Sequence, residues 1–196
     1  MKILSIDVDY AFSPDISRYD DFVEGSNLST EEEWKILSTR GFTKPRINEK
    51  KLKDLLCVFR QALKHTDDVF FIKNHHEIVE KLAQDCTYHI VNFDHHHDIF
   101  YPGWHDKKLL DEGNWVNWLD DLGLVSSYTW YRNSDSEDLD ADVSLSCQYN
   151  EKFYCNDSLP KFDKIFVCSS PNWIHGDNIY VVDDFKNEVS NGKVCL

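Results

Sequence analysis

The sequence VNFDHHHDIF, residues 91–100, places three consecutive histidines between two aspartates directly after an apolar run. In an extended segment, alternate side chains point to the same side, so Asp94, His96 and Asp98 are expected to share one face. Carboxylate oxygens with an imidazole nitrogen suit Mn²⁺, Fe²⁺, Co²⁺ or Zn²⁺, and this stretch has no thiolate that would favour a structural zinc. We interpret these three residues as metal ligands; the simpler alternative is a histidine-rich polar loop.

Two other clusters in the sequence contain the same kinds of donor atom. Asp7 and Asp9 alternate in the segment SIDVDY, and His75 and His76 follow an apolar run in the segment KNHHEI. Each of these two clusters alone is more typical of a turn or a helix cap than of a metal site. Together, the three clusters supply four carboxylates and two imidazoles, which is enough for two metal ions with bridging carboxylates and a position for water.

Each of the three clusters comes at the end of a segment that is predicted to be a β-strand. Residues 2–8, 68–74 and 87–93 are short apolar runs rich in β-branched or aromatic residues. Apolar residues at helical spacing over 47–65, and a Ser/Thr–Glu capping pattern from residue 29, predict two helices after the first strand. Because ligands bind at the carboxyl edge of open α/β sheets, we expect the clusters to converge there.

The rest of the chain continues the same α/β pattern. Helices are predicted at 76–85 and 113–123, the second closed by Gly123, and strands at 124–131, 143–149 and 164–170. The acidic segment 133–142 is expected to be a solvated loop. A chain of 196 residues suits one domain with a full core, so we expect residues 1–196 to form a single three-layer α/β/α domain with a mostly parallel central sheet.

The composition restricts the partners and the compartment. Lys and Arg number 21 against 35 Asp and Glu, a formal charge of -14 that repels nucleic acid and anionic membranes and attracts cations. No run approaches about 18 apolar residues, and MKILSIDVDY has no small-residue cleavage site, so neither a membrane span nor a signal peptide is predicted. The six scattered cysteines, without a C-x-x-C pair, indicate reduced thiols in a cytoplasmic protein.

These motifs resemble those of the arginase-deacetylase superfamily, and most closely its small peptide-arginase-like branch. Ureohydrolases of the superfamily carry D-x-H-x-D, a D-x-D after S-[IFL], and a histidine that enters a helix after a strand; DHHHD, SIDVD and NHHE are similar. GNWVNWLDDLGLVSSYTW and SSPNW (169–173) are similar to two further segments of the branch. In the family D-x-D follows D-x-H-x-D, whereas here it opens the chain, so the resemblance implies an arginase-like fold that is circularly permuted.

The resemblance also implies a ligand set and a reaction. Two divalent ions, usually Mn²⁺ in this family, would be bridged by Asp7 and Asp94, and completed by His75 and Asp98 for one ion and by His96 and Asp9 for the other. A hydroxide that bridges the ions would attack a guanidinium carbon, convert peptidyl arginine to ornithine and release urea. The implied partner is an arginine-containing peptide or another cationic guanidinium compound, because the loops that grip free arginine in true arginases have no counterpart here.

Several further roles stay open on the sequence alone. The candidates for proton transfer or for guanidinium binding are Glu77, His76, His97 and His105. For His95 and His97, a role in supporting the metal ligands or in facing the substrate competes evenly with plain packing. Asn114 and Trp115 either line the site or cap and pack their own helix.

Other functions remain as alternatives. A phosphoesterase of the Asp-His-His type matches DHH at 94–96, but such enzymes also carry a GGGH segment, which the seven glycines of this chain do not form. A haloacid-dehalogenase-like phosphatase begins with a D-x-D-x-[TV] motif, but this chain has Ala11 in place of the Thr or Val. Both would bring a phosphate to an acidic protein. A metal-dependent deacetylase, or a catalytically silent metal-binding protein on the same fold, is compatible with the same ligands.

Overall fold

The computed structural model describes residues 1–12, 28–99, 109–134, 136, 147–150 and 159–192. In chain order the elements are β1 (Lys2–Asp7), η1 (Val8–Ala11), α2 (Thr30–Thr39), α3 (Glu49–Leu63), β2 (Val69–Ile72), α4 (Glu77–Lys81), β3 (Tyr88–Phe93), α5 (Trp115–Asp121), β4 (Val125–Tyr131), β5 (Cys147–Asn150), β6 (Lys164–Cys168), α6 (Pro171–Ile174), η3 (Gly176–Asn178) and α7 (Val181–Gly192). Helices separate the first four strands, as the alternating sequence pattern predicts.

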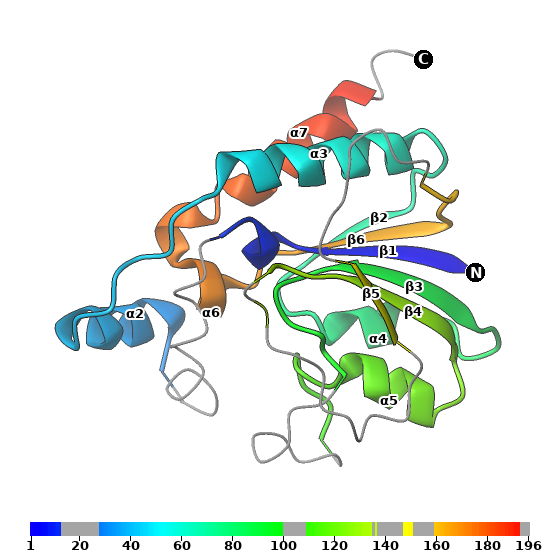
Figure 1. The fold of residues 1–196 in the computed structure, drawn as a ribbon, viewed down its shortest axis with the longest axis horizontal. Coiled ribbons are helices and arrows are strands. Elements are labelled where there is room, and N and C mark those ends of the chain that lie inside the picture. Colours follow the sequence, from blue (N-terminus) through cyan, green and yellow to red (C-terminus); the bar gives the residue numbers. More distant parts are fainter. Residues whose placement is uncertain (13–27, 100–108, 135, 137–146, 151–158, 193–196) are drawn as a thin grey trace.

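Six parallel strands form the central sheet, in the order β2-β6-β1-β3-β4-β5. Helices α3 and α7 lie over one face of the sheet, and α4 and α5 lie over the other (Figure 1). This arrangement confirms the predicted three-layer α/β/α class with a parallel sheet. Strands β2 and β3 are parallel, as predicted, but they are not neighbours. β6 pairs with both β1 and β2, so β6 and β1 lie between β2 and β3.

The alternation of side chains along β1 assigns its residues to the two faces of the sheet. Leu4 and Ile6 pack into the core under α3 and α7, whereas Ile3 packs into the core on the α4 and α5 side. Because successive side chains of a strand point to opposite faces, Ser5 and Asp7 lie on the α4 and α5 side as well. β1 therefore buries apolar side chains on one face and delivers a carboxylate at its end on the other.

Local signals explain where several helices begin and end. Ser29 and Glu32 form a reciprocal capping box at the start of α2, as their spacing predicts. Gly123 follows α5 with a φ of 70°, a left-handed conformation that glycine adopts without a steric penalty. Helix α7 was not predicted from the sequence. It nevertheless contributes to the core, where the ring of Phe185 meets that of Phe59 in α3 edge to face at 5.2 Å.

The cysteines differ from the prediction that all six are reduced thiols. Cys86 and Cys168 are free, but Cys57 is disulfide-bonded. Sequence spacing reveals only local pairs such as C-x-x-C, so it did not indicate this bond. Within the described residues, no helix has both the length and the apolar character needed to cross a membrane.

Candidate metal centre

Three segments that are distant in the sequence meet at the carboxyl edge of the sheet. β1 ends at Asp7 and leads into η1, the loop after β2 carries His75, and the loop after β3 carries residues 94–98. The structure thus brings together all six predicted ligands in overlapping groups of donor atoms, namely Asp7, Asp9, His75, Asp94, His96 and Asp98. The convergence that the strand pattern predicted is therefore found.

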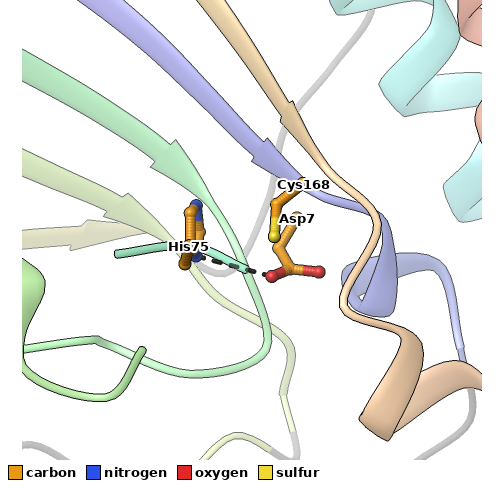
Figure 2. Close-up of side chains that lie close together, drawn as sticks. All are labelled: Asp7, His75 and Cys168. Carbon is orange, nitrogen blue, oxygen red and sulfur yellow. Dashed lines mark ion pairs between the residues drawn. The ribbon is translucent and has the colours of Figure 1, made fainter. Parts of the chain in front are cut away.

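His75 lies among three carboxylates. Its Nδ1 atom is 2.7 Å from Asp98 Oδ2, 3.0 Å from Asp94 Oδ2 and 3.4 Å from Asp7 Oδ2. Figure 2 shows the side chain of Asp7 directed toward His75, with Cys168 beside both. All four of the ionisable residues His75, Asp7, Asp94 and Asp98 are at most 4% exposed. The donor atoms of His75, Asp94 and Asp98 lie within 4.8 Å of one another, close enough to bind one ion.

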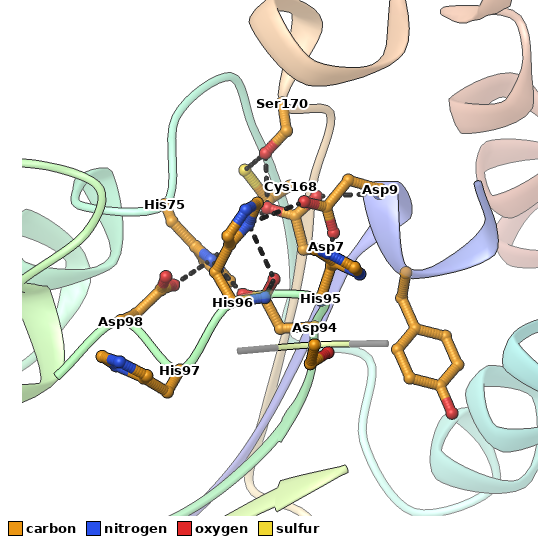
Figure 3. A network of polar contacts seen from close by, with 12 residues as sticks. Asp7, Asp9, His75, Asp94, His95, His96, His97, Asp98, Cys168 and Ser170 are labelled. Carbon is orange, nitrogen blue, oxygen red and sulfur yellow. Dashed lines mark hydrogen bonds and ion pairs between the residues drawn. The ribbon is translucent and has the colours of Figure 1, made fainter. Parts of the chain in front are cut away.

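His96 forms a second group with Asp9 and Asp94. Its Nδ1 atom is 3.1 Å from Asp9 Oδ2 and 3.9 Å from Asp94 Oδ1, and the donor atoms of the three residues also lie within 4.8 Å of one another. Asp94 belongs to both groups, with Oδ2 toward His75 and Oδ1 toward His96 (Figure 3). His96 is the most accessible of the six, with 16% of its side chain exposed.

The backbone that carries these side chains differs from the extended segments that were predicted. Asp9 lies in the helical turn η1, where its N–H donates to Asp7 Oδ1 at 3.0 Å. β3 ends at Phe93, the chain then bends, and Asp98 adopts a φ of 53°. The alternation argument is therefore wrong about the conformation of both motifs, because local turns rather than the pleat of a strand orient the carboxylates.

Burial and the crowding of like charges perturb the ionisable groups of the cluster. Burial raises the pKa of Asp7, and the carboxylates of Asp9 and Asp94 raise it further. Burial and the charge of Asp98 raise the pKa of Asp94. Burial alone would lower the pKa of His75, but Asp98 and Asp94 outweigh it and raise that pKa well above its usual value. In the metal-free chain, a proton on His75 therefore supplies positive charge to the carboxylates.

Neighbouring side chains fix the orientation of these donors. Ser5 Oγ is 2.6 Å from His75 Nε2, which leaves Nδ1 for the carboxylates. The indole N–H of Trp115 donates to Asp98 Oδ2 at 2.6 Å, and the amide of Asn92 donates to Asp94 Oδ2 at 3.2 Å. Outer contacts of this kind orient the ligands in metal sites, and their loss typically weakens metal binding or activity by about 10 to 100 times.

No family model, curated protein or solved structure matches the chain. The resemblance to the arginase-deacetylase superfamily therefore rests on the sequence motifs alone. The geometry supports a coarser conclusion, namely that buried aspartate and histidine side chains lie at distances suited to binding a metal ion.

Cys168 at the end of β6, Ser170 just after it and Trp173 in α6 also reach the cluster, and they were not identified from the sequence as site residues. The Ser170 hydroxyl donates to Asp7 Oδ2, and its oxygen lies 3.2 Å from Cys168 Sγ. The ring of Trp173 lies 4.7 Å from that of His96. The strand predicted at 164–170 ends at the same edge of the sheet as the other three, so the rule that located the six ligands applies to these residues too.

Two of the residues predicted as candidates for proton transfer, His97 and Glu77, make packing and capping contacts instead. His97 is buried, its Nδ1 accepts the backbone N–H of Ile99 at 3.1 Å, and its ring meets Trp130 edge to face. Glu77 Oε1 accepts the backbone N–H of Asn74 at 2.9 Å, as a residue in the first turn of a helix commonly does. These contacts are those of packing and capping, and they give no support to a role in proton transfer.

The other residues to which the sequence assigned possible roles are His76, His105, Asn114 and Trp115. His76 Nδ1 is buried and has no hydrogen-bond partner within the described residues, and His105 lies outside them. Asn114 accepts from the N–H of Asp111 at 3.0 Å and donates to the carbonyl of Leu109 at 2.7 Å. Asn114 thus holds the segment before α5 in place, while Trp115 beside it contacts the predicted ligand Asp98.

His95 supports the cluster through its backbone. Its N–H donates to Asp9 Oδ1 at 3.3 Å, and its Nδ1 lies 3.2 Å from the amide nitrogen of Asn133. Burial, followed by the neighbouring His96, lowers the pKa of His95 to about 4. Its ring is therefore neutral at neutral pH.

Proposed function

We propose that the protein is a dinuclear metal-dependent amidinohydrolase that converts peptidyl arginine to ornithine and releases urea. The observation that carries this proposal is the position of Asp94, whose two carboxylate oxygens face two different histidines. One carboxylate is thus common to the group with His75 and Asp98 and to the group with Asp9 and His96. A carboxylate shared by two adjoining ligand groups supports a pair of metal ions rather than a single one.

The donor set is chemically suited to two divalent cations such as Mn²⁺. Each group combines two carboxylates with one imidazole, and Asp7 lies beside the first group. Hard oxygen donors with a borderline nitrogen suit Mn²⁺, and they also accept Fe²⁺, Co²⁺ or Zn²⁺. Four buried carboxylates with two imidazoles also leave negative charge that such cations would neutralise. When bound, a pair of divalent ions makes water acidic enough to act as a nucleophile near neutral pH.

The accessible side of the cluster supports a cationic substrate. His96 is the most exposed of the predicted ligands, and the ring of Trp173 lies beside it at 4.7 Å. The face of an aromatic ring attracts a guanidinium ion through its quadrupole. The formal charge of -14 also attracts cations and repels phosphate esters. These features favour a guanidinium substrate over the phosphate substrates of the alternative functions.

The proposed reaction requires the protein mainly to position its reactants. Water adds to the guanidinium carbon, the bond from that carbon to the side-chain nitrogen breaks, and the nitrogen takes up a proton and leaves as an amine, so urea is the second product. Ser5 and Trp115 hold His75 and Asp98 in fixed orientations before the substrate arrives. Donors that are already oriented do not have to reorganise during the reaction, which lowers its barrier.

Urea release from a short blocked peptide that contains one arginine tests the proposal. With Mn²⁺ supplied, we expect wild-type protein to release urea and to leave a peptide whose mass corresponds to ornithine. In the Asp94→Asn variant, an amide nitrogen replaces one oxygen of the shared carboxylate and the negative charge is lost, so one group loses a donor and the other keeps only a weaker, neutral one. Because a metal pair contributes several kcal/mol and about 1.4 kcal/mol is tenfold in rate, we expect kcat/KM to fall at least about a hundredfold.

The matched control is Asp67→Asn, which makes the same chemical change at an exposed aspartate before β2. Its activity should equal that of the wild type. Free arginine and a peptide with acetyl-lysine serve as further substrates, because they separate a peptide amidinohydrolase from an arginase and from a deacetylase. Urea release that persists in chelator, or that is equal in the Asp94→Asn variant, would falsify the proposal.

A further inference from the structure

Cys168 brings a thiol to the edge of the sheet at which the carboxylates lie. It is the last residue of β6, and it is paired in register with Asp7 of β1 on one side and with Ile72 of β2 on the other. It is 0% exposed and packs with the core on the α4 and α5 side, the side on which Asp7 lies. Its position in the sheet therefore directs the sulfur toward the cluster.

The sulfur lies within ligand distance of one half of the cluster. Cys168 Sγ, a carboxylate oxygen of Asp7 and a ring nitrogen of His75 all lie within 4.8 Å of one another (Figure 2). His75 is also the nitrogen donor of the group with Asp94 and Asp98. The thiol thus adjoins the position at His75, whereas the group at His96 consists of that histidine with two carboxylates.

The charges around the sulfur provide a separate indication that a cation binds here. The carboxylates of Asp7, Asp9, Asp94 and Asp98 are buried, and their ionic partners within the described residues are the imidazoles of His75 and His96. Asp9 Oδ2, in the adjoining group, is buried and accepts no hydrogen bond within the described residues, although His96 Nδ1 lies 3.1 Å away. Burying carboxylates without enough neutralising positive charge costs free energy of folding, so bound cations would stabilise the cluster as a whole.

We propose that Cys168 is a ligand, as a thiolate, of the metal ion held at His75. This inference rests on the proposed dinuclear site and makes its two positions unequal. One position would combine sulfur, nitrogen and oxygen donors from Cys168, His75 and the neighbouring carboxylates, while the other would combine nitrogen and oxygen donors from His96, Asp9 and Asp94. On binding, the bond from sulfur to hydrogen is replaced by a bond from sulfur to the metal, and the proton passes to solvent.

Unequal donors give the two positions different metal preferences. Thiolate ligands favour zinc and other softer ions, whereas carboxylate ligands suit Mn²⁺. The position at His75 should therefore prefer Zn²⁺ or Co²⁺ over Mn²⁺ more strongly than the position at His96 does. A protein loaded with zinc and manganese together is then expected to contain both, rather than two ions of one kind.

Cobalt spectroscopy of the full-length protein tests the thiolate ligand directly. A thiolate bound to Co²⁺ gives a sulfur-to-metal charge-transfer band in the near ultraviolet, in addition to the visible bands of the ion. We expect the wild type to show both sets of bands and the Cys168→Ser variant to keep the visible bands but lose the charge-transfer band. The matched control is Cys86→Ser, which removes the second of the two cysteines that are free within the described residues and should change neither set.

Metal competition gives a second readout. We expect the Cys168→Ser variant to bind Zn²⁺ at least about tenfold more weakly, the lower end of the loss seen even for outer-sphere partners of a metal site. Its affinity for Mn²⁺ at the other position should be unchanged. If the serine variant does not fold, X-ray absorption of the zinc-loaded Cys86→Ser protein decides, because a bound thiolate places sulfur at about 2.3 Å from the zinc.

The outcomes separate this inference from the proposed function. Visible cobalt bands without a charge-transfer band, or a zinc environment of oxygen and nitrogen alone, overturn the thiolate ligand and leave the amidinohydrolase proposal intact. No cobalt binding at all overturns both. A charge-transfer band that depends on Cys168, in a protein that releases no urea, supports the thiolate ligand and removes the proposed activity.

Discussion

The three consecutive histidines have three different environments, so their number says little about their roles. His95 is buried and neutral and contacts Asn133, His96 faces Asp9 and Asp94, and His97 packs against Trp130. The sequence favours His96 as the ligand of the three, and within the described residues it is the one of them that belongs to a group of possible metal donors. What distinguishes His96 is that its Nδ1 meets carboxylates that come from two separate segments.

Trp115 connects the core of the protein to a predicted ligand. The residue is fully buried, and its indole N–H donates to Asp98 Oδ2. Replacement by phenylalanine keeps an aromatic ring in the core but removes this donor, so Asp98 is held less firmly. We expect the Trp115→Phe variant to bind Mn²⁺ or Co²⁺ roughly 10 to 100 times more weakly, as measured by calorimetric titration.

Trp118 lies in the same helix, is half-buried, and serves as the control. The Trp118→Phe variant makes the same change in side-chain size and should bind metal like the wild type. Equal metal affinity for both variants would show that the hydrogen bond from Trp115 does not orient Asp98 for metal binding.

At the scale of elements, the sequence was sufficient to predict most strands and the edge at which they deliver polar residues. The short apolar runs at β1, β2 and β3, each followed by Asp or His, indicated that edge. The pairing of β6 with β1 and β2 could not be predicted, because strand order depends on contacts between distant segments. For the same reason Cys168 and Ser170, which that pairing brings beside Asp7, were not recognised as neighbours of the site.

The turns after the strands were the other feature that the sequence did not reveal. Asp98 and Ser170 both adopt positive φ, which few residues other than glycine do, and no glycine or proline at these two positions signals a special backbone. Both side chains nevertheless contact the cluster, through His75 for Asp98 and through Asp7 for Ser170. Sparsely populated backbone conformations of this kind concentrate at functional sites.

Helix α7 should stabilise the fold without taking part in the site. Phe185 is fully buried and packs against Phe59 of α3 on the face of the sheet opposite to α4 and α5. We expect the Phe185→Ala variant to lose about 3–5 kcal/mol in the free energy of unfolding, measured with urea, because the truncation leaves a cavity. At temperatures where the variant is folded, its metal stoichiometry should equal that of the wild type.

Tyr180, which precedes α7 and is 53% exposed, is the control for this truncation. The Tyr180→Ala variant should change the free energy of unfolding by no more than about 0.5 kcal/mol. A Phe185→Ala variant that is equally stable would mean that α7 is not part of the folded core.

At the scale of the whole molecule, two separate features make the protein acidic around the proposed metal site. The chain carries a formal charge of -14, and four of its carboxylates are buried in one cluster. The general charge raises the local concentration of cations, and the cluster would supply the ligands for the proposed metal ions. The same cluster makes the folded state dependent on whatever positive charge is available, which is a proton on His75 when metal is absent.

The stability of the metal-free protein should therefore fall as the pH rises above about 7. The carboxylates of Asp98 and Asp94 raise the pKa of His75 in the folded chain, so the folded state binds that proton more tightly than the unfolded state does. The stabilisation is fully present below the pKa of an unfolded histidine, about 6.5, and is lost as the pH rises through the folded value. Urea unfolding in chelator should show this loss at no more than about 1.4 kcal/mol per pH unit for each proton.

Metal should remove this dependence because divalent ions replace the proton on His75. A metal present at 100 times its dissociation constant adds about 2.7 kcal/mol to the free energy of unfolding. With saturating Mn²⁺, we therefore expect the unfolding free energy to be higher and nearly constant between about pH 7 and 9, while the chelated protein loses stability over that range. Parallel profiles with and without Mn²⁺ would mean that metal and proton do not compete for the same cluster.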